Sequence, residues 1–442
     1  MDIDVAALRS RLPAGLIERQ PLLWLNPGYD PQADGRAESL DPMLAQARFA
    51  RCAGLLQQVF PELRPGGGQL ASPLVPIPRF RDLVAPGRPA GAWLLKRDDA
   101  LPVAGSVKAR GGFHEVLSLA ERIGAEAGLL RDGTTDRRVL AGPPARAILG
   151  RHTLAVGSTG NLGLGIGLIG AGLGLRAVVH MSADAKEWKK QRLRSRGIEV
   201  VEHPGDYAAA VAAGRAIAQA DPMMHFVDDE RSEALFLGYA AAAHELQAQL
   251  RAAGRPVDAD HPLFVYLPCG VGGAPGGILY GLKRLFGSHV HGFFVEPTAS
   301  PCMLVQLACG PRQPVSVYDV GLDNRTEADG LAVGLASPLV APLMARLLSG
   351  VFTVDEAIFY ADAWRLEDRE GIYVEPSAAT GLRGPLQVLD TPRGLAYLQR
   401  HRLDSARMEG ATHVIWSTGG ALVPEDVRQE FRERGRQLAR AA

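Results

Sequence analysis

The chain has 442 residues, of which 47% are hydrophobic and 22% charged, values typical of a soluble globular protein with a sizeable core. Lys plus Arg and Asp plus Glu number 48 each, so the charge balance gives no reason to expect nucleic acid or a membrane as a partner. We expect two domains at this length. The N-terminus shows no signal-peptide pattern and the four cysteines form no CxxC pair, so we expect a cytoplasmic location.

Residues 1 to about 70 are typical of helical segments and end in the loop RPGGG at 64–68. Downstream, we expect helices after Lys108, after the turn at 157–161, at 184–196 and at 207–220, with an irregular insertion or linker at about 124–150. Short β-branched runs predict strands at 92–96, 153–156, 177–180, 199–202, 263–267, 290–295 and 413–416. This alternation, with few hairpin signals, predicts an α/β fold with open, mostly parallel sheets.

The first segment with chemical character is GSVKARGG at 105–112. Lys108 lies between small residues at the expected start of a helix. That position leaves room for a flat ring to approach the amine and favours its uncharged, nucleophilic form. On this segment alone, a surface lysine is the more common interpretation.

The second segment is VGSTGNLG at 156–163, at an expected strand-to-helix turn. Its backbone N–H groups can hold a carboxylate above a flat cofactor, while Asn161 bonds a ring oxygen. The glycines at 165–170 match GxGxxG and Asp184 follows, a pattern that would indicate a dinucleotide site. They fall inside the expected helix, past the turn at which a pyrophosphate binds, so we expect them to pack that helix closely. An NAD-binding oxidoreductase stays an alternative of another class.

The third segment is PCGVGGAPGG at 268–277, between an expected strand and helix. Its glycines free several N–H groups to converge at a helix N-terminus, which makes a phosphate cradle; a plain tight turn is the alternative. The loop lacks the GK[ST] ending that Mg-nucleotide chemistry uses. The fourth segment, STGG at 417–420, follows a strand, where a hydroxyl can face a ligand in the sheet crevice or simply form a turn.

Taken in order, these segments resemble the fold-type II (tryptophan synthase β-like) pyridoxal-5′-phosphate (PLP) enzymes, and among them the D-serine dehydratase (D-serine ammonia-lyase) family. The similarity spans nearly the whole chain, and residues 124–150 and the extreme ends are least similar. Small departures are Ala274 and the pair Leu164-Gly165. Further blocks that resemble the family are LNPG at 25–28, HMSAD at 180–184, VEPT at 295–298, ADGLAVG at 328–334 and EPS at 375–377.

The resemblance implies a role for each site residue. Lys108 would carry PLP as a Schiff base, Asn161 would bond the cofactor's 3′-oxygen, and Thr418 would face the pyridine nitrogen. Glu296 would help to bind a monovalent cation, K⁺ or Na⁺, with an ordinary surface carboxylate as the alternative. The phosphate would be bound by the N–H groups of Gly270, Val271, Gly272 and Gly273, and the substrate carboxylate by Ser158, Thr159 and Gly160.

The implied reaction is β-elimination of water from D-serine to aminoacrylate, which hydrolyses to pyruvate and ammonia; D-threonine is a further possible substrate. The freed Lys108 amine is expected to remove the Cα proton, and the cofactor phosphate or Thr159 to protonate the leaving hydroxyl. A neutral hydroxyl at Thr418 favours prompt loss of the leaving group over transamination. The alternatives are an L-serine or L-threonine dehydratase, a serine racemase, a β-replacement synthase or a non-catalytic PLP-binding protein.

The expected organisation is a large PLP-binding domain formed by residues 1–149 and 235–442, and a small α/β domain at 150–234. The site would lie in the cleft between them. The resemblance favours a monomer whose only partner is a small D-amino acid.

Overall fold

The computed structural model describes residues 5–36, 39–87, 91–158, 160–205 and 207–441. The chain forms two compact units, here called the first and second unit. The first comprises Met1–Ser39, Pro73–Ala100 and Ala243–Ala442, and the second Leu40–Ser72 and Leu101–Ala242. The second unit thus takes in residues well before 150; the domain division expected from the sequence stays a prediction.

The first unit is built on a seven-stranded sheet with the order β1-β10-β9-β8-β11-β3-β2. The five central strands are parallel, and the two edge strands, β1 and β2, run antiparallel to their neighbours. Four of the strands were predicted; the sequence analysis missed β10 and the two edge strands, which are too short to show a period of two. The strands are β1 (Leu23–Leu25), β2 (Leu74–Pro76), β3 (Ala92–Arg97), β8 (Leu263–Pro268), β9 (Val290–Pro297), β10 (Gly350–Val354) and β11 (Thr412–Ser417).

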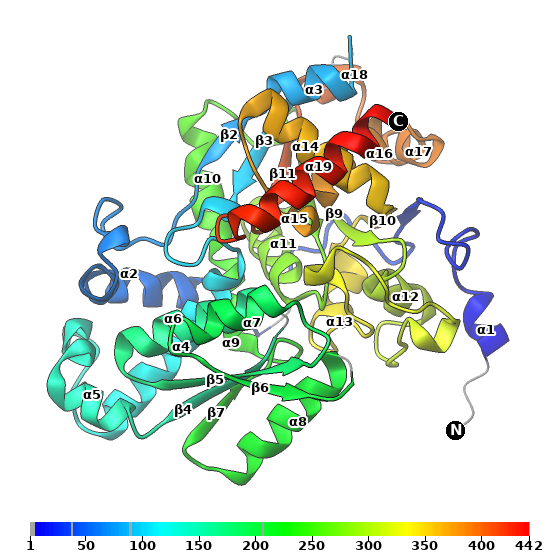
Figure 1. Cartoon of the computed structure of the whole chain (residues 1–442). Helices are drawn as coiled ribbons and strands as arrows, with labels where there is room; N and C mark the ends of the chain where they lie inside the picture. Colours follow the sequence, from blue (N-terminus) through cyan, green and yellow to red (C-terminus); the bar gives the residue numbers. More distant parts are fainter. Residues whose placement is uncertain (1–4, 37–38, 88–90, 159, 206, 442) are drawn as a thin grey trace. The chain divides into compact units, whose positions relative to one another are not determined.

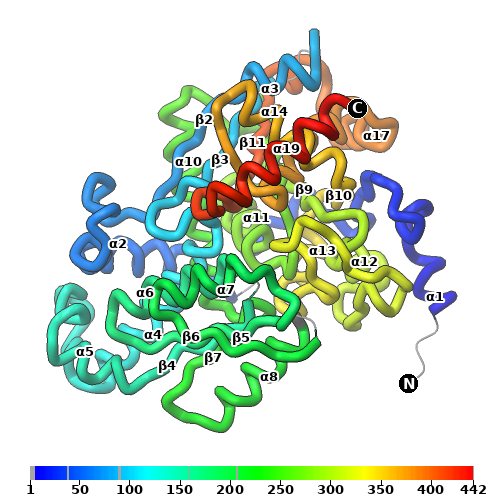
Figure 2. The backbone as a smooth tube through the Cα atoms, viewed as in Figure 1, coloured from blue at the N-terminus to red at the C-terminus, as the bar shows by residue number. Residues whose placement is uncertain are grey.

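Helices surround this sheet and bury its apolar faces. The C-terminal helix α19 (Glu425–Ala441) lies along α14 (Glu356–Glu370), as Figures 1 and 2 both show. The remaining helices of the unit are α1 (Val5–Arg9), α3 (Pro78–Val84), α10 (Ala242–Ala252), α11 (Gly273–Phe286), α12 (Cys302–Cys309), α13 (Val340–Leu347), α15 (Pro376–Ala379), α16 (Gly384–Leu389), α17 (Pro392–Arg400) and α18 (Ser405–Gly410).

The second unit holds a four-stranded, all-parallel sheet with the order β6-β5-β4-β7. Helix α6 lies on one face and α8 on the other, the doubly covered arrangement that parallel sheets require (Figure 1). The sequence analysis missed β7. The strands are β4 (Thr153–Gly157), β5 (Arg176–Ser182), β6 (Glu199–His203) and β7 (Met224–Val227); the helices are α2 (Pro42–Val59), α4 (Lys108–Glu126), α5 (Pro143–Leu149), α6 (Asn161–Leu173), α7 (Glu187–Arg194), α8 (Tyr207–Ala220) and α9 (Glu233–Ala240).

The expectation of an irregular stretch at 124–150 is wrong in part, because α5 and the short 3₁₀ helix Arg137–Ala141 occupy much of it. The GxGxxG glycines do lie inside α6, as predicted. A methyl group at Gly167 would lie 2.1 Å from Ile198 Cδ1, and one at Gly170 would lie 2.7 Å from Leu154 Cδ1. These glycines therefore allow close packing and form no pyrophosphate turn.

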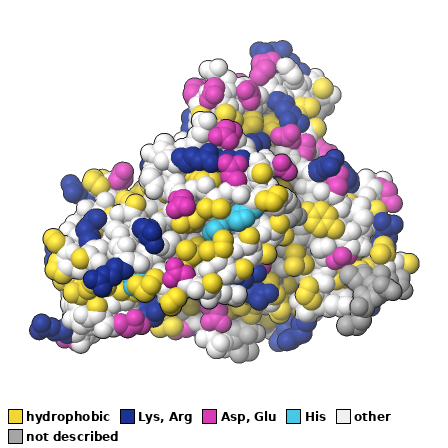
Figure 3. Space-filling model, turned by 60° about the horizontal axis from the view of Figure 1, so that its bottom comes forward, with side chains coloured by type: hydrophobic (Ala, Val, Ile, Leu, Met, Phe, Trp, Pro, Cys, Tyr) yellow, Lys and Arg dark blue, Asp and Glu magenta, His cyan; other side chains and the backbone are white. Residues whose placement is uncertain are grey.

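Charged side chains of both signs are interspersed on the face that Figure 3 shows, and no continuous basic strip crosses the described residues of that face. Within the described parts of the chain, no helix combines the length and the apolar character needed to cross a bilayer.

Candidate active site

Lys108 is the first residue of α4, so the predicted helix start is confirmed. The Ser106 hydroxyl oxygen accepts a hydrogen bond from the Lys108 backbone N–H at 3.3 Å. The Lys108 side chain is 23% exposed, and its Nζ lies 2.7 Å from Oδ2 of Asp229, whose side chain is 8% exposed. An amine and a carboxylate within hydrogen-bond distance can exchange a proton.

Asp229 lies in the turn between β7 and α9 and was not identified from the sequence. Its second oxygen, Oδ1, is buried and accepts no hydrogen bond from the described residues. An unsatisfied buried carboxylate oxygen is costly unless a ligand or water completes it. The available signal was the acidic run DDE at 228–230, separated by one residue from Ser232, which caps the start of α9, but this run is also typical of a solvated turn.

Ser158 closes the strand-to-helix turn that the sequence analysis singled out. Its buried hydroxyl oxygen accepts the N–H groups of Gly160 and Gly163, each at 3.0 Å. Because a hydroxyl that accepts two bonds still has its own hydrogen, Ser158 can donate to an anion. The Gly160 N–H is engaged with Ser158, so the contact predicted between Gly160 and the substrate carboxylate stays a prediction.

The same turn positions the residue predicted to bond the cofactor ring. Gly160 precedes α6 with φ +144°, a conformation that favours glycine, and Asn161 is the first residue of α6. Thr159, predicted to contact the substrate and to donate a proton, lies outside the described residues.

The glycine loop in the first unit connects β8 to α11. Gly272 caps α11 with φ +111°, and a methyl group there would lie 2.5 Å from Met303 Cε. Three residues of the loop are buried and Gly270 is half-buried; among the described residues, none of their N–H groups donates a hydrogen bond. Free amides at a helix N-terminus suit an anion with several oxygens, so the loop fits a phosphate group. The residues are Gly270, Val271, Gly272 and Gly273.

Thr418 directly follows β11 in the first unit and is half-buried. Strand β11 is held by the buried indole of Trp416, whose Nε1 donates to Asp98 Oδ2 at 2.9 Å. The position, at the carboxyl end of a central parallel strand, is one at which open α/β sheets place ligand contacts. The role of Thr418 at the cofactor nitrogen stays a prediction.

Glu296, at the end of β9, is fully buried, so the alternative of an ordinary surface carboxylate is wrong. Its two oxygens accept the N–H groups of Met303 and Leu304, at 2.8 and 3.0 Å, at the start of α12. Burial raises the pKa of this carboxyl to about 8. Among the described residues, no group of three or more His, Cys, Asp and Glu could hold a metal ion, and cation binding by Glu296 stays a prediction.

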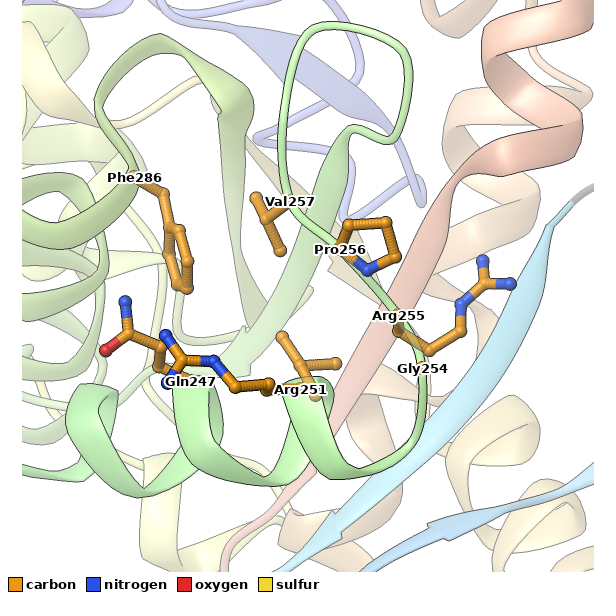
Figure 4. A pocket seen from close by; sticks show the side chains of 8 residues that line it. Gln247, Arg251, Gly254, Arg255, Pro256, Val257 and Phe286 are labelled. Carbon is orange, nitrogen blue, oxygen red and sulfur yellow. The ribbon is translucent and has the colours of Figure 1, made fainter.

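A separate cavity of about 410 Å³ lies in the first unit between α10, the segment that follows it and the end of α11 (Figure 4). Its lining includes Gln247, Arg251 and Phe286 and none of the residues predicted to bind cofactor or substrate. This cavity is therefore not the candidate active site.

Comparison with known proteins agrees with these features. The family model "Pyridoxal-phosphate dependent enzyme" matches residues 67–393, a span that includes Lys108, both predicted binding loops and Glu296. The chain is 57% identical to "Probable D-serine dehydratase" of Burkholderia lata, over 98% of this chain and 96% of the relative. It is 58% identical to "Probable D-serine dehydratase" of Cupriavidus pinatubonensis, over 98% and 97%.

Among solved structures, the chain is similar to holo diaminopropionate ammonia lyase from Escherichia coli, with a TM-score of 0.71, 20% identity and coverage of 95% of this chain and 97% of that one. At this identity the likeness shows the fold alone, an α/β fold with one mixed and one parallel sheet. The cofactor expected from the sequence, pyridoxal phosphate, agrees with the family match. The chain belongs to the pyridoxal-phosphate dependent enzymes of fold-type II, and within them to the D-serine dehydratase family.

Proposed function

We propose that this chain converts D-serine to pyruvate and ammonia by β-elimination of water, with PLP held on Lys108. The pairing of Lys108 with Asp229 supports this proposal most directly, because it places a proton-accepting amine beside a buried carboxylate. Identities of 57–58% to relatives named as D-serine dehydratases, over nearly the whole chain, support the substrate. D-threonine, which carries the same leaving group, is a second substrate under this proposal.

The bound cofactor supplies an electron-withdrawing ring that acidifies the Cα–H of the substrate. The residues of the chain then have separate tasks. The Lys108 amine takes the Cα proton at Nζ, and Asp229 Oδ2, 2.7 Å away, stabilises the resulting ammonium. Such a pair is the ordinary arrangement of a general base and its orienting group.

The substrate carboxylate binds at the turn before α6. The Ser158 hydroxyl, fixed by two backbone N–H groups, donates its hydrogen to this carboxylate, and the positive end of the α6 dipole adds attraction. Thr159 contributes a second contact. Asn161 holds the cofactor ring from the same turn, so one short segment aligns cofactor and substrate.

The cofactor phosphate is held by the free amides of the loop at 270–273 and by the dipole of α11, and Thr418 meets the ring nitrogen. Departure of the β-hydroxyl needs a proton. Asp229 Oδ1, buried and without a partner among the described residues, is a candidate donor besides the phosphate and Thr159, because the proton that Lys108 takes from Cα can pass to this carboxyl, whose other oxygen lies 2.7 Å from Lys108 Nζ.

The test is pyruvate formation by the purified, cofactor-loaded protein with D-serine, L-serine and D-threonine supplied separately. We expect turnover with D-serine, and its loss in Lys108→Ala; Lys186→Ala, a change at another lysine of the second unit, serves as the matched control. Pyruvate from L-serine alone would replace the proposal with an L-serine dehydratase. The visible absorbance of bound PLP without turnover of any of the three would indicate a non-catalytic PLP-binding protein.

The monomeric state and the cytoplasmic location expected from the sequence belong to the same proposal. Size-exclusion chromatography with light scattering on the purified protein tests the first, and cell fractionation tests the second.

A further inference from the structure

Asp229 is the middle residue of three consecutive acidic residues in the turn after β7. Its two neighbours both pair with one arginine of α8: Arg215 Nε lies 2.9 Å from Asp228 Oδ2, and Arg215 Nη2 lies 2.9 Å from Glu230 Oε2. The guanidinium thus satisfies the flanking carboxylates and leaves the central one, Asp229, for Lys108.

The backbone of this turn is closed around Asp228. Its side chain accepts the Glu230 N–H at 3.1 Å, and its carbonyl accepts the N–H groups of Arg231 and Ser232 at 3.2 and 2.9 Å. In this closed turn, Asp228 and Glu230 pair with Arg215, while Asp229 between them pairs with Lys108.

Residues on both sides of the turn bind the helix that carries Lys108. The Ser232 hydroxyl donates to Glu115 of α4, and His225 Nε2 lies 2.9 Å from the other oxygen of Glu115. Glu115 is buried, so this attachment is shielded from solvent. The turn is therefore bound to α8 through Asp228 and Glu230, the neighbours of Asp229, and to α4 through His225 and Ser232, which precede and follow these acidic residues.

We propose that Arg215 is a positioning residue: by binding Asp228 and Glu230 together, it makes Asp229 the carboxylate that meets Lys108. This inference rests on the proposed function, in which Lys108 moves the substrate proton. Without Arg215, three adjacent carboxylates would repel one another, and any of them could swing toward the lysine. Arginine suits this task because its fork presents several N–H donors in a fixed plane.

The test compares Arg215→Gln and Arg215→Lys with a matched control, Arg194→Gln. Arg194 also bridges two carboxylates of the second unit, those of Glu187 and Glu202, but on α7. We expect Arg215→Gln to lower kcat for D-serine about tenfold or more with little change in KM, the size of effect that a misplaced proton-transfer group produces. Lysine reaches only one carboxylate at a time, so Arg215→Lys should have a kcat between those of Arg215→Gln and the unaltered protein. The control Arg194→Gln should retain kcat within about twofold.

A second readout uses the cofactor-free protein. Hydrogen exchange measured by mass spectrometry should be faster at residues 230–232 in Arg215→Gln, and unchanged in Arg194→Gln. If Arg215→Gln does not fold, Arg215→Lys carries the test: lysine reaches only one of the two carboxylates at a time, so kcat for D-serine should fall below that of Arg194→Gln.

Two results would overturn the proposal: a kcat within twofold of the unaltered protein in folded Arg215→Gln, or unchanged exchange at residues 230–232. Exchange is read without cofactor or substrate, so it reports on Arg215 even if D-serine is not the substrate. Conversely, failure of the unaltered protein to form pyruvate would reject the proposed function and leave the exchange result standing.

Discussion

The Lys108–Asp229 region of the second unit and the glycine loop of the first unit, both predicted to serve the active site, are built in different ways. Around Lys108 the functional groups are side chains, and ion pairs on neighbouring elements hold them in place. In the loop at 270–273 the groups predicted to bind are backbone amides, and their arrangement depends on the positive φ of Gly272 and on the absence of a Cβ atom at the glycines. No acidic or basic side chain of the loop takes part.

This difference predicts which substitutions each region tolerates. A side-chain site fails when the chemical group is lost, even if the shape is kept, as when a carboxylate becomes an amide. A backbone site fails when a carbon atom is added, even if no polar group changes. Two buried titratable groups of the first unit add a further contrast, because their protonation changes the stability of the fold.

The largest effect is expected for Asp229→Asn, which keeps the shape and removes the carboxylate beside Lys108. We expect kcat for D-serine to fall about 100-fold, because an amide neither stabilises the ammonium nor carries a proton. Steady-state pyruvate formation measures this, with the exposed Asp184→Asn as the control. A kcat within threefold would mean that the Lys108–Asp229 contact is not used in turnover.

The next effect is expected for Gly272→Ala. L side chains rarely adopt φ +111°, so alanine strains the loop at this residue; the added methyl would also lie 2.5 Å from Met303 Cε, the end of a flexible side chain that can shift. We expect about 100-fold weaker PLP binding, because the amides lose their common direction. Titration of the cofactor-free protein, followed by the absorbance of bound PLP, gives this affinity.

The matched control is Gly287→Ala, at the other end of the same helix, α11. Gly287 also has positive φ (+55°), and a methyl there would meet no atom within 4 Å. The Gly287→Ala variant should lower the free energy of unfolding by roughly 1–2 kcal/mol through backbone strain and leave PLP affinity unchanged. Equal losses of affinity in the two variants would show that strain in α11, and not the direction of the loop amides, controls binding.

A smaller, pH-dependent effect is expected at His413, a buried residue whose ring nitrogen Nδ1 lies 2.8 Å from the Tyr266 hydroxyl. Burial lowers the pKa of His413 to about 3, whereas the unfolded chain has the ordinary value of 6.5. The unfolded state therefore binds more protons between these values, and stability falls as the pH drops from 6.5 toward 3, by up to about 1.4 kcal/mol per pH unit.

Urea unfolding midpoints between pH 7.5 and 4 would measure this slope. The His413→Gln variant should show a shallower fall, because its side chain does not titrate. An unchanged slope in the variant would assign the acid sensitivity to other groups, such as the buried His291, whose pKa burial also lowers.

The smallest effect is expected for Glu296→Gln, and its pH dependence has the opposite sign. Burial raises the pKa of Glu296 to about 8, above the ordinary 4.5. Between these two pH values the folded state binds more protons than the unfolded state, so the free energy of unfolding falls as the pH rises. Glutamine keeps one oxygen for the start of α12, so we expect a loss of about 1 kcal/mol at pH 7 and a flatter profile above pH 5. If stability fell more steeply with rising pH in Glu296→Gln than in the unaltered protein, the raised pKa of Glu296 would be contradicted.

The sequence predicted four of the five central parallel strands of the first unit and the elements around each binding loop, because their apolar runs are long and glycine or serine marks the turns between them. It also predicted that Lys108 begins a helix and that the GxGxxG glycines lie within one. It missed β7, β10 and the short edge strands, whose formation depends on neighbours distant in the chain.

The sequence alone determined the family and the cofactor and predicted which lysine carries it, since these follow from short segments whose residue types and order carry the chemistry. Only the tertiary structure decided that Asp229 meets Lys108, that Arg215 binds the acidic residues on either side, and that Glu296 is buried at the start of a helix. Each of these contacts joins residues well separated in the chain or depends on burial. Local pattern fixes which groups are available, and packing fixes which of them meet.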